Sequence, residues 1–202
     1  VCSSDLQRRN HRAGLETVSK ATRKSWLGRF TPLSGIQSAW IKSLLTVWGE
    51  GVRGGMAPRK PTEHSCWRGL KGGRWSDKVL ERFTAAIEQA RREGFSGPQA
   101  LNRARSILWP QPTSTLIDTA LHDDDVEFIE RCVLEAFESG DPVYLVGVSY
   151  YTTRKKISDI TRELQLVAPW LTDGEARKRV RWCLEIFRAK AFLSVKREIH
   201  KL

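Results

Sequence analysis

Apolar residues recur at helical spacing along much of this 202-residue chain, and this pattern constrains the fold more than any other feature. The clearest case runs from Ser76 to Gly94, where one helix face would carry Val79, Leu80, Phe83, Ile87 and Ala90. Ser76 is a favourable N-cap, and Gly94 follows a basic last turn, as is typical at the end of a helix. We therefore predict a helix between these two residues.

Comparable spacing predicts helices in other segments, so the expected fold class is all-α. The predicted ranges are 36–48, 98–109, 113–121, 126–137, 143–151 and 154–166, with a long helix after Thr172. The stretch Val143–Tyr151 also has the β-branched and aromatic composition of a strand. We predict a helix there because a single strand would have no partner with which to pair.

Three consecutive carboxylates, Asp123–Asp125, precede the apolar stripe that begins at Val126. We expect them at the N-terminus of that helix, where the backbone dipole favours negative charge. A metal-binding triad is the alternative. Consecutive residues on a helix point in different directions and do not converge on one ion, which argues against it.

Residues 1–35 and 49–76, on either side of the predicted helix at 36–48, show little helical periodicity. Residues 1–35 are polar and basic, which predicts a disordered arm that can be deleted with little change in the thermal midpoint. Residues 1–6 match the in-frame translation of a common sequencing adapter, so we expect them to be an artefact; a genuine basic tail is the alternative.

Residues 49–76 contain seven glycines and two prolines and are predicted to form a loop. One helical domain is expected over 36–202.

Charge is unevenly distributed along the chain, whose formal net charge is +11. Residues 1–82 carry 16 basic and 6 acidic side chains, residues 83–153 carry 5 and 11, and residues 154–202 carry 13 and 6. Basic ends around an acidic middle favour a polyanionic partner, because each phosphate neutralised by Lys or Arg releases counterions. A membrane partner is not expected, since no segment pairs a Lys-rich face with a broad apolar face.

Residues that usually carry catalysis or bind metals form no recognisable pattern in this sequence. The four cysteines and four histidines lack the intervals of a zinc site, and Cys132 and Cys183 fall on apolar helix faces, as buried thiols do in a reducing cytosol. Residues 69–73 lack the Lys-Ser/Thr continuation and the flanking strand of a phosphate-binding loop. The sequence therefore predicts no enzyme, no cofactor and no metal.

The last third contains two amphipathic helices joined by a connector, Val167–Leu171, which is typical of a helix-turn-helix module, here predicted over 143–202. The connector leads to Thr172–Glu175, which fits a capping box in which Thr172 accepts from the amide of Glu175 while the Glu175 carboxylate reaches back. The connector is longer than the three or four residues of a compact helix-turn-helix, so we expect a looser variant.

The helix after Thr172 begins with a concentration of positive charge. Its apolar stripe runs from Ala176 to Ala191, and the opposite face carries Lys178, Arg181, Trp182 and Glu185, with Arg177 and Arg179 at the flanks. Cations this early oppose the helix dipole, a local conflict that is expected where a partner supplies negative charge. A solvated basic face is the alternative. The helix pair, the capping box and the charge distribution together favour duplex DNA, with this helix as the recognition helix in the major groove. The predicted DNA-binding residues on this helix are Arg177, Lys178, Arg179 and Arg181.

Several of these residues together resemble a phage protein family. The segments that carry the resemblance are Gln37–Trp40, Leu44–Gly49, Ile157–Leu164, Ala168–Trp170 and Arg177–Val180, with Leu184 following. They look like small phage proteins related to the late-gene antiterminators called Q, over roughly Gln37 to the C-terminus. The Gly-rich loop at 49–76 departs from that pattern.

This resemblance implies a helical protein with a module similar to the promoter-binding region 4 of sigma factors. Such a protein binds DNA near a late promoter and makes paused RNA polymerase ignore terminators, in the cytoplasm of a bacterial host. The implied DNA contacts are Arg177, Lys178 and Arg181, and the implied contacts to backbone phosphates are Arg154, Lys155 and Lys156. A DNA-packaging recognition subunit of the small-terminase kind is the rival interpretation, and it should assemble into a large oligomer.

Overall fold

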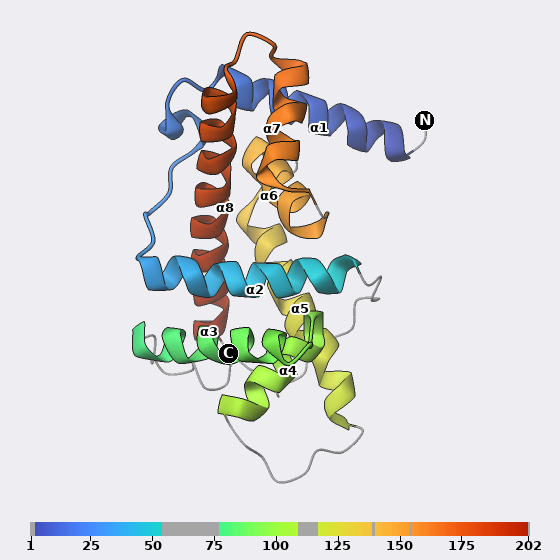
Figure 1. The fold of residues 1–202 in the computed structure, drawn as a ribbon, viewed down its shortest axis with the longest axis vertical. Coiled ribbons are helices and arrows are strands. Elements are labelled where there is room, and N and C mark those ends of the chain that lie inside the picture. Colours follow the sequence, from blue (N-terminus) through green and yellow to red (C-terminus); the bar gives the residue numbers. More distant parts are fainter. Residues whose placement is uncertain (1–2, 54–76, 109–116, 139, 154, 202) are drawn as a thin grey trace. The chain divides into compact units, whose positions relative to one another are not determined.

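The computed structural model describes residues 3–53, 77–108, 117–138, 140–153 and 155–201. Every regular element in these ranges is helical, which confirms the all-α prediction (Figure 1). The elements are α1 Ser3–Lys20, η1 Lys24–Leu27, α2 Gly35–Arg53, α3 Asp77–Arg92, α4 Gly97–Leu108, α5 Ile117–Ala136, α6 Pro142–Thr152, α7 Ile157–Val167 and α8 Asp173–Lys201.

The chain forms two compact units that are not continuous in sequence. Unit 1 comprises residues 1–32 and 137–190 and holds α1, η1, α6, α7 and the first part of α8. Unit 2 comprises residues 33–136 and 191–202 and holds α2 to α5 and the last part of α8. This division differs from the single domain over 36–202 with a separate arm that the sequence led us to expect.

The helix α1 corrects the prediction of a disordered arm over residues 1–35. Leu15 and Val18 are buried, and α1 packs on α6 and α7. Ala21 and Leu27, which follow α1, are buried as well. The apolar stripe of α1 is too short to stand out against its polar residues, and burial in unit 1 stabilises the helix more than local propensity does. Deletion of this segment should therefore destabilise unit 1.

Unit 2 is built on α2, which packs against α3, α4 and α5. Trp40 is fully buried, and its ring meets Phe83 and Phe192 edge-on at centroid distances of 6.4 and 5.6 Å. The helix continues to Arg53, so it includes glycines at which we predicted a loop; residues 54–76 of that loop lie outside the described residues. Gly51 has a packing role, since a Cβ atom there would lie 2.8 Å from Val126 Cγ1.

A single helix, α5, runs where two helices were predicted at 113–121 and 126–137, with residues 113–116 outside the described residues. The backbone of Asp123–Asp125 is helical in the interior of α5, so the prediction that these residues form a helix N-terminus is wrong. No glycine or proline lies between Ile117 and Val126, and nothing in the chain therefore interrupts the helix.

Unit 1 has Phe187 of α8 at its centre. The Phe187 ring stacks on Phe137 and Tyr151 at centroid distances of 4.9 and 5.8 Å. Gly147 of α6 faces this ring, and a Cβ atom there would lie only 2.1 Å from Phe187 Cδ2, so glycine permits the close approach of α6 to α8. The helix α6 confirms the helical prediction for 143–151, and the Asp141 side chain caps it by accepting from the backbone N–H of Val143 at 2.8 Å.

Candidate nucleic-acid interface

The first helix of the predicted DNA-binding module begins later than expected. Lys156 is the N-cap of α7, and its backbone N–H donates to Asp159 Oδ2 at 2.8 Å. The Thr152 hydroxyl donates to the Val148 carbonyl of α6 at 2.7 Å and so belongs to the end of the preceding helix. Lys155 and Lys156 therefore precede α7 and do not form its first turn, and Arg154 lies outside the described residues.

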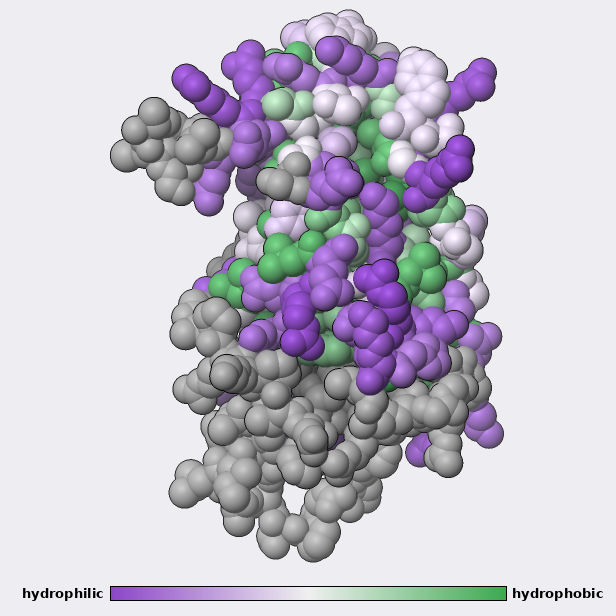
Figure 2. Space-filling view, turned by 180° about the vertical axis from the view of Figure 1, so that it is seen from behind, coloured by the Kyte–Doolittle hydropathy of each residue, from purple (hydrophilic) through white to green (hydrophobic). Residues whose placement is uncertain are grey.

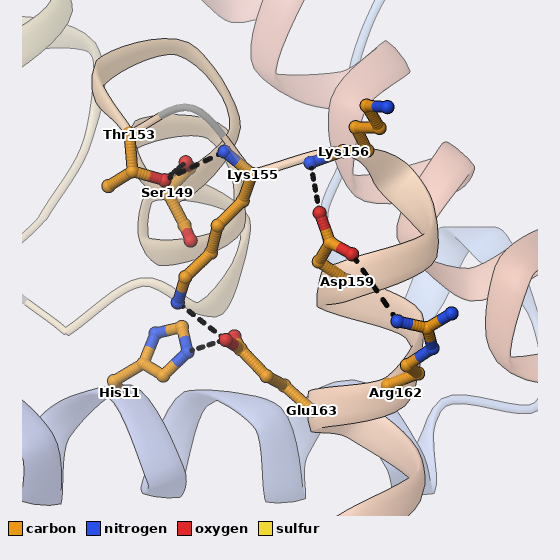
Figure 3. Close-up of polar contacts among 8 residues, drawn as sticks. All are labelled: His11, Ser149, Thr153, Lys155, Lys156, Asp159, Arg162 and Glu163. Carbon is orange, nitrogen blue, oxygen red and sulfur yellow. Dashed lines mark hydrogen bonds and ion pairs between the residues drawn. The ribbon is translucent and has the colours of Figure 1, made fainter.

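Lys155 belongs to a polar cluster where α1 meets α7 (Figure 3). Its Nζ lies 2.5 Å from Glu163 Oε1, and His11 Nε2 lies 3.1 Å from Glu163 Oε2. The Lys155 ammonium is thus already balanced by a carboxylate of the protein. Lys156 is exposed and has no ion pair with a carboxylate of the described residues, so it is the freer of the two predicted phosphate contacts.

The predicted capping box at the start of α8 is confirmed. The backbone N–H of Glu175 donates to Thr172 Oγ1 at 3.3 Å, and the backbone N–H of Thr172 donates to Glu175 Oε2 at 3.2 Å. Hydrogen bonds from the Thr172 backbone and then from its hydroxyl lower the pKa of Glu175. Gln165 Nε2 donates to the Leu171 carbonyl at 3.3 Å and ties the connector to α7. The first turn of α8 is therefore held at a fixed place in unit 1.

The predicted cations of α8 differ in their environments. Lys178 and Arg181 are exposed, and neither has an ion pair with a carboxylate in the described part of the chain. Lys178 Nζ lies over the Trp182 ring, 5.3 Å from its centroid. Arg177 is less available to a partner, because its Nη2 forms an ion pair with Asp173 Oδ2 at 3.3 Å and its Nε is buried without a hydrogen-bond partner.

Arg179 serves the fold of unit 1. Its side chain is buried, and its Nε donates to the Ala21 carbonyl at 2.8 Å. The structure therefore corrects its assignment as a DNA contact. The helical pattern placed Arg179 at the flank of the outward face, but the segment that covers it was expected to be disordered.

The segment that covers Arg179 is the strap, which we define as residues 21–30. Lys24 of the strap forms an ion pair with Glu185 of α8, and its Nζ lies 4.5 Å from the centroid of the Phe30 ring. Partial burial lowers the pKa of Lys24. No sequence pattern indicates these residues, because a single turn of 3₁₀ helix has no periodicity.

The exposed side of α1 carries further cations that were assigned to the arm. Arg8 and Arg9 are exposed and form no ion pair with a described carboxylate, while Arg12 Nε lies 3.5 Å from Glu16 Oε1. Figure 2 shows hydrophilic side chains where α1 projects at the upper left. Unit 1 thus adds positive charge outside the two helices that the sequence indicated.

Two kinds of site are absent from the described ranges. No group of three or more His, Cys, Asp or Glu side chains in these ranges is placed to hold a metal ion. None of the helices there is both long and apolar enough to cross a membrane. Cys132 and Cys183 are buried as predicted, and burial raises the pKa of each thiol to about 12.

Comparison of the chain with known protein families, curated proteins and solved structures finds no match. The resemblance to phage antiterminators stays a prediction. The exposed cations of unit 1 are therefore the main guide to the function of the protein.

Proposed function

We propose that the protein binds duplex DNA through unit 1 and reads sequence with the outward face of the first turns of α8. The observation that carries this proposal is the combination of exposure and fixed position at Lys178 and Arg181. Both cations lack ion pairs with described carboxylates, while the capping box and the buried Arg179 hold their helix in place. Lys and Arg side chains on a fixed helix face suit phosphates and the acceptor edge of guanine.

The biological role that we propose is regulation of phage transcription by antitermination, with RNA polymerase as the protein partner in the bacterial cytoplasm. The resemblance described above and the net charge of +11 support this role. A reporter gene placed behind a late promoter and a terminator should be expressed when the protein is present. A large ring-sized oligomer in size-exclusion chromatography, without terminator read-through, would instead favour a DNA-packaging subunit.

DNA reading is tested by selecting binding sites from a random-sequence duplex library and measuring affinities by fluorescence anisotropy. The Arg181→Ala variant should lose about 1–3 kcal/mol of binding free energy on the selected site and little on random duplex. The logarithm of the affinity should fall linearly with the logarithm of the salt concentration.

Lys156→Ala is the comparison variant, because Lys156 precedes α7, is exposed and has no ion pair with a carboxylate of the described residues. Its loss should weaken both duplexes alike, since a phosphate contact carries no sequence information. Equal behaviour of the two variants on selected and random duplexes, or a flat salt response, would show that α8 does not read DNA.

A further inference from the structure

The strap follows α8 over about three helical turns. Two contacts and one close approach mark its course, and they advance in the same order along both segments. Arg179 Nε donates to the Ala21 carbonyl at 2.8 Å, Lys24 pairs with Glu185, and a Cβ atom on Gly28 would lie 3.9 Å from Lys190 Nζ. Gly28 has φ 120°, a conformation that side-chain-bearing residues rarely adopt, and the strap turns there. The strap and α8 therefore run side by side.

The strap changes the charge of the outward face of α8. Lys178, Arg181 and Glu185 share this face, because they are three and four residues apart on the helix. Glu185 is the only acidic residue between Ala176 and Lys190, and its side chain is 54% exposed. An unpaired carboxylate here would repel a phosphate that approaches Arg181. The ion pair with Lys24 neutralises it.

The strap also presents groups of its own that suit a nucleic acid. Arg23 and Arg29 are exposed, and neither forms an ion pair with a carboxylate in the described ranges. Trp26 lies between them in sequence and is 63% exposed, which is unusual for the largest apolar side chain. Arg side chains are common donors to the backbone phosphates of duplex DNA, and the indole N–H of Trp26 is a further donor on the same segment.

We propose that the strap and the outward face of α8 form one DNA-binding surface, in which Arg23 and Arg29 contact backbone phosphates and Lys24 neutralises Glu185. This inference rests on the proposed function of unit 1 and extends it to residues that no sequence pattern indicated. Phosphate contacts from the strap would orient α8 on the duplex.

The first test compares single cations in the full-length protein bound to a random-sequence duplex. Arg23→Ala should lower the slope of log affinity against log salt by about 0.9, the value expected for one lost phosphate contact on B-DNA. Lys42→Ala removes the same charge from an exposed position on α2 in unit 2 and should leave the slope unchanged. Trp26→Ala should also weaken binding.

The second test is a double-mutant cycle on the ion pair. Lys24→Gln should weaken binding several-fold, because it exposes the Glu185 carboxylate, while Lys24→Arg should keep wild-type affinity. Glu185→Gln should raise the affinity of the Lys24→Gln variant more than it raises that of the wild type. Circular dichroism melting of each variant separates a loss of binding from a loss of fold.

The outcomes separate the strap from the proposed function. If Arg181→Ala and Lys178→Ala weaken binding but Arg23→Ala and Trp26→Ala behave like Lys42→Ala, the strap inference is overturned and DNA binding by α8 stands. If the effects of Lys24→Gln and Glu185→Gln on the binding free energy are additive, Lys24 does not act by neutralising Glu185. If the wild-type protein binds no duplex at all, the proposed function fails, and the strap inference fails with it.

Discussion

Replacing Gly147 by alanine tests the close packing of α6 on α8 in unit 1. The added Cβ would lie 2.1 Å from Phe187 Cδ2 and 2.4 Å from its Cγ, far inside van der Waals contact. Phe187 is fully buried and stacked on two other rings, so it has no space into which to turn. Overpacking of a core typically costs about 1–3 kcal/mol, and the higher helix propensity of alanine offsets about 1 kcal/mol of this. A contact of 2.1 Å with a ring that cannot move belongs at the upper end of this range, about 3 kcal/mol, so we expect a net loss of about 2 kcal/mol in unfolding free energy.

Gly174→Ala is the matched control within the same unit. Gly174 is also helical, but nothing lies within 4 Å of its Cβ position, so alanine should leave stability unchanged or raise it by up to about 1 kcal/mol. Urea unfolding followed by far-UV circular dichroism measures both effects. The melting midpoint of the Gly147→Ala variant should fall by about 2–4 °C for each kcal/mol lost. If both variants are as stable as the wild type, Phe187 does not hold the position on which this reasoning depends.

Three further predictions concern the core, the cap of α8 and the buried thiols. Leu15→Ala should lower the unfolding free energy by about 2–5 kcal/mol. Leu166 is 82% exposed, so Leu166→Ala should change the unfolding free energy by less than about 0.5 kcal/mol. Equal effects of the two variants in urea unfolding would mean that α1 is not docked. Thr172→Ala should cost about 1 kcal/mol in the same assay, and no loss would contradict the capping box. In a variant with Cys2 and Cys66 replaced by serine, Cys132 and Cys183 should not react with a thiol reagent at neutral pH until denaturant is added. The raised pKa of each buried thiol keeps it protonated. Rapid labelling of the native protein would contradict this prediction.

The sequence alone determined the features that depend on neighbouring residues. The helical spacing from Val79 to Ala90 and the breaks around it predicted α3, and the lack of a partner strand favoured a helix at α6. The capping box at Thr172 was predicted correctly, because its donors and acceptors lie within one helical turn. The same local pattern identified Lys178 and Arg181 as outward-facing.

Only the tertiary structure decided which of these side chains are free to meet a partner. Arg179 hydrogen-bonds to a carbonyl 158 residues away, Lys24 pairs with a carboxylate 161 residues away, and His11 contacts Glu163 across 152 residues. Periodicity shows which face of a helix is apolar, but it does not show what covers the edges of that face. Here α1 and the strap cover those edges. The apolar stripe of α1 is too short to be recognised until α6 and α7 supply the surface on which it is buried, and the strap has no periodicity at all.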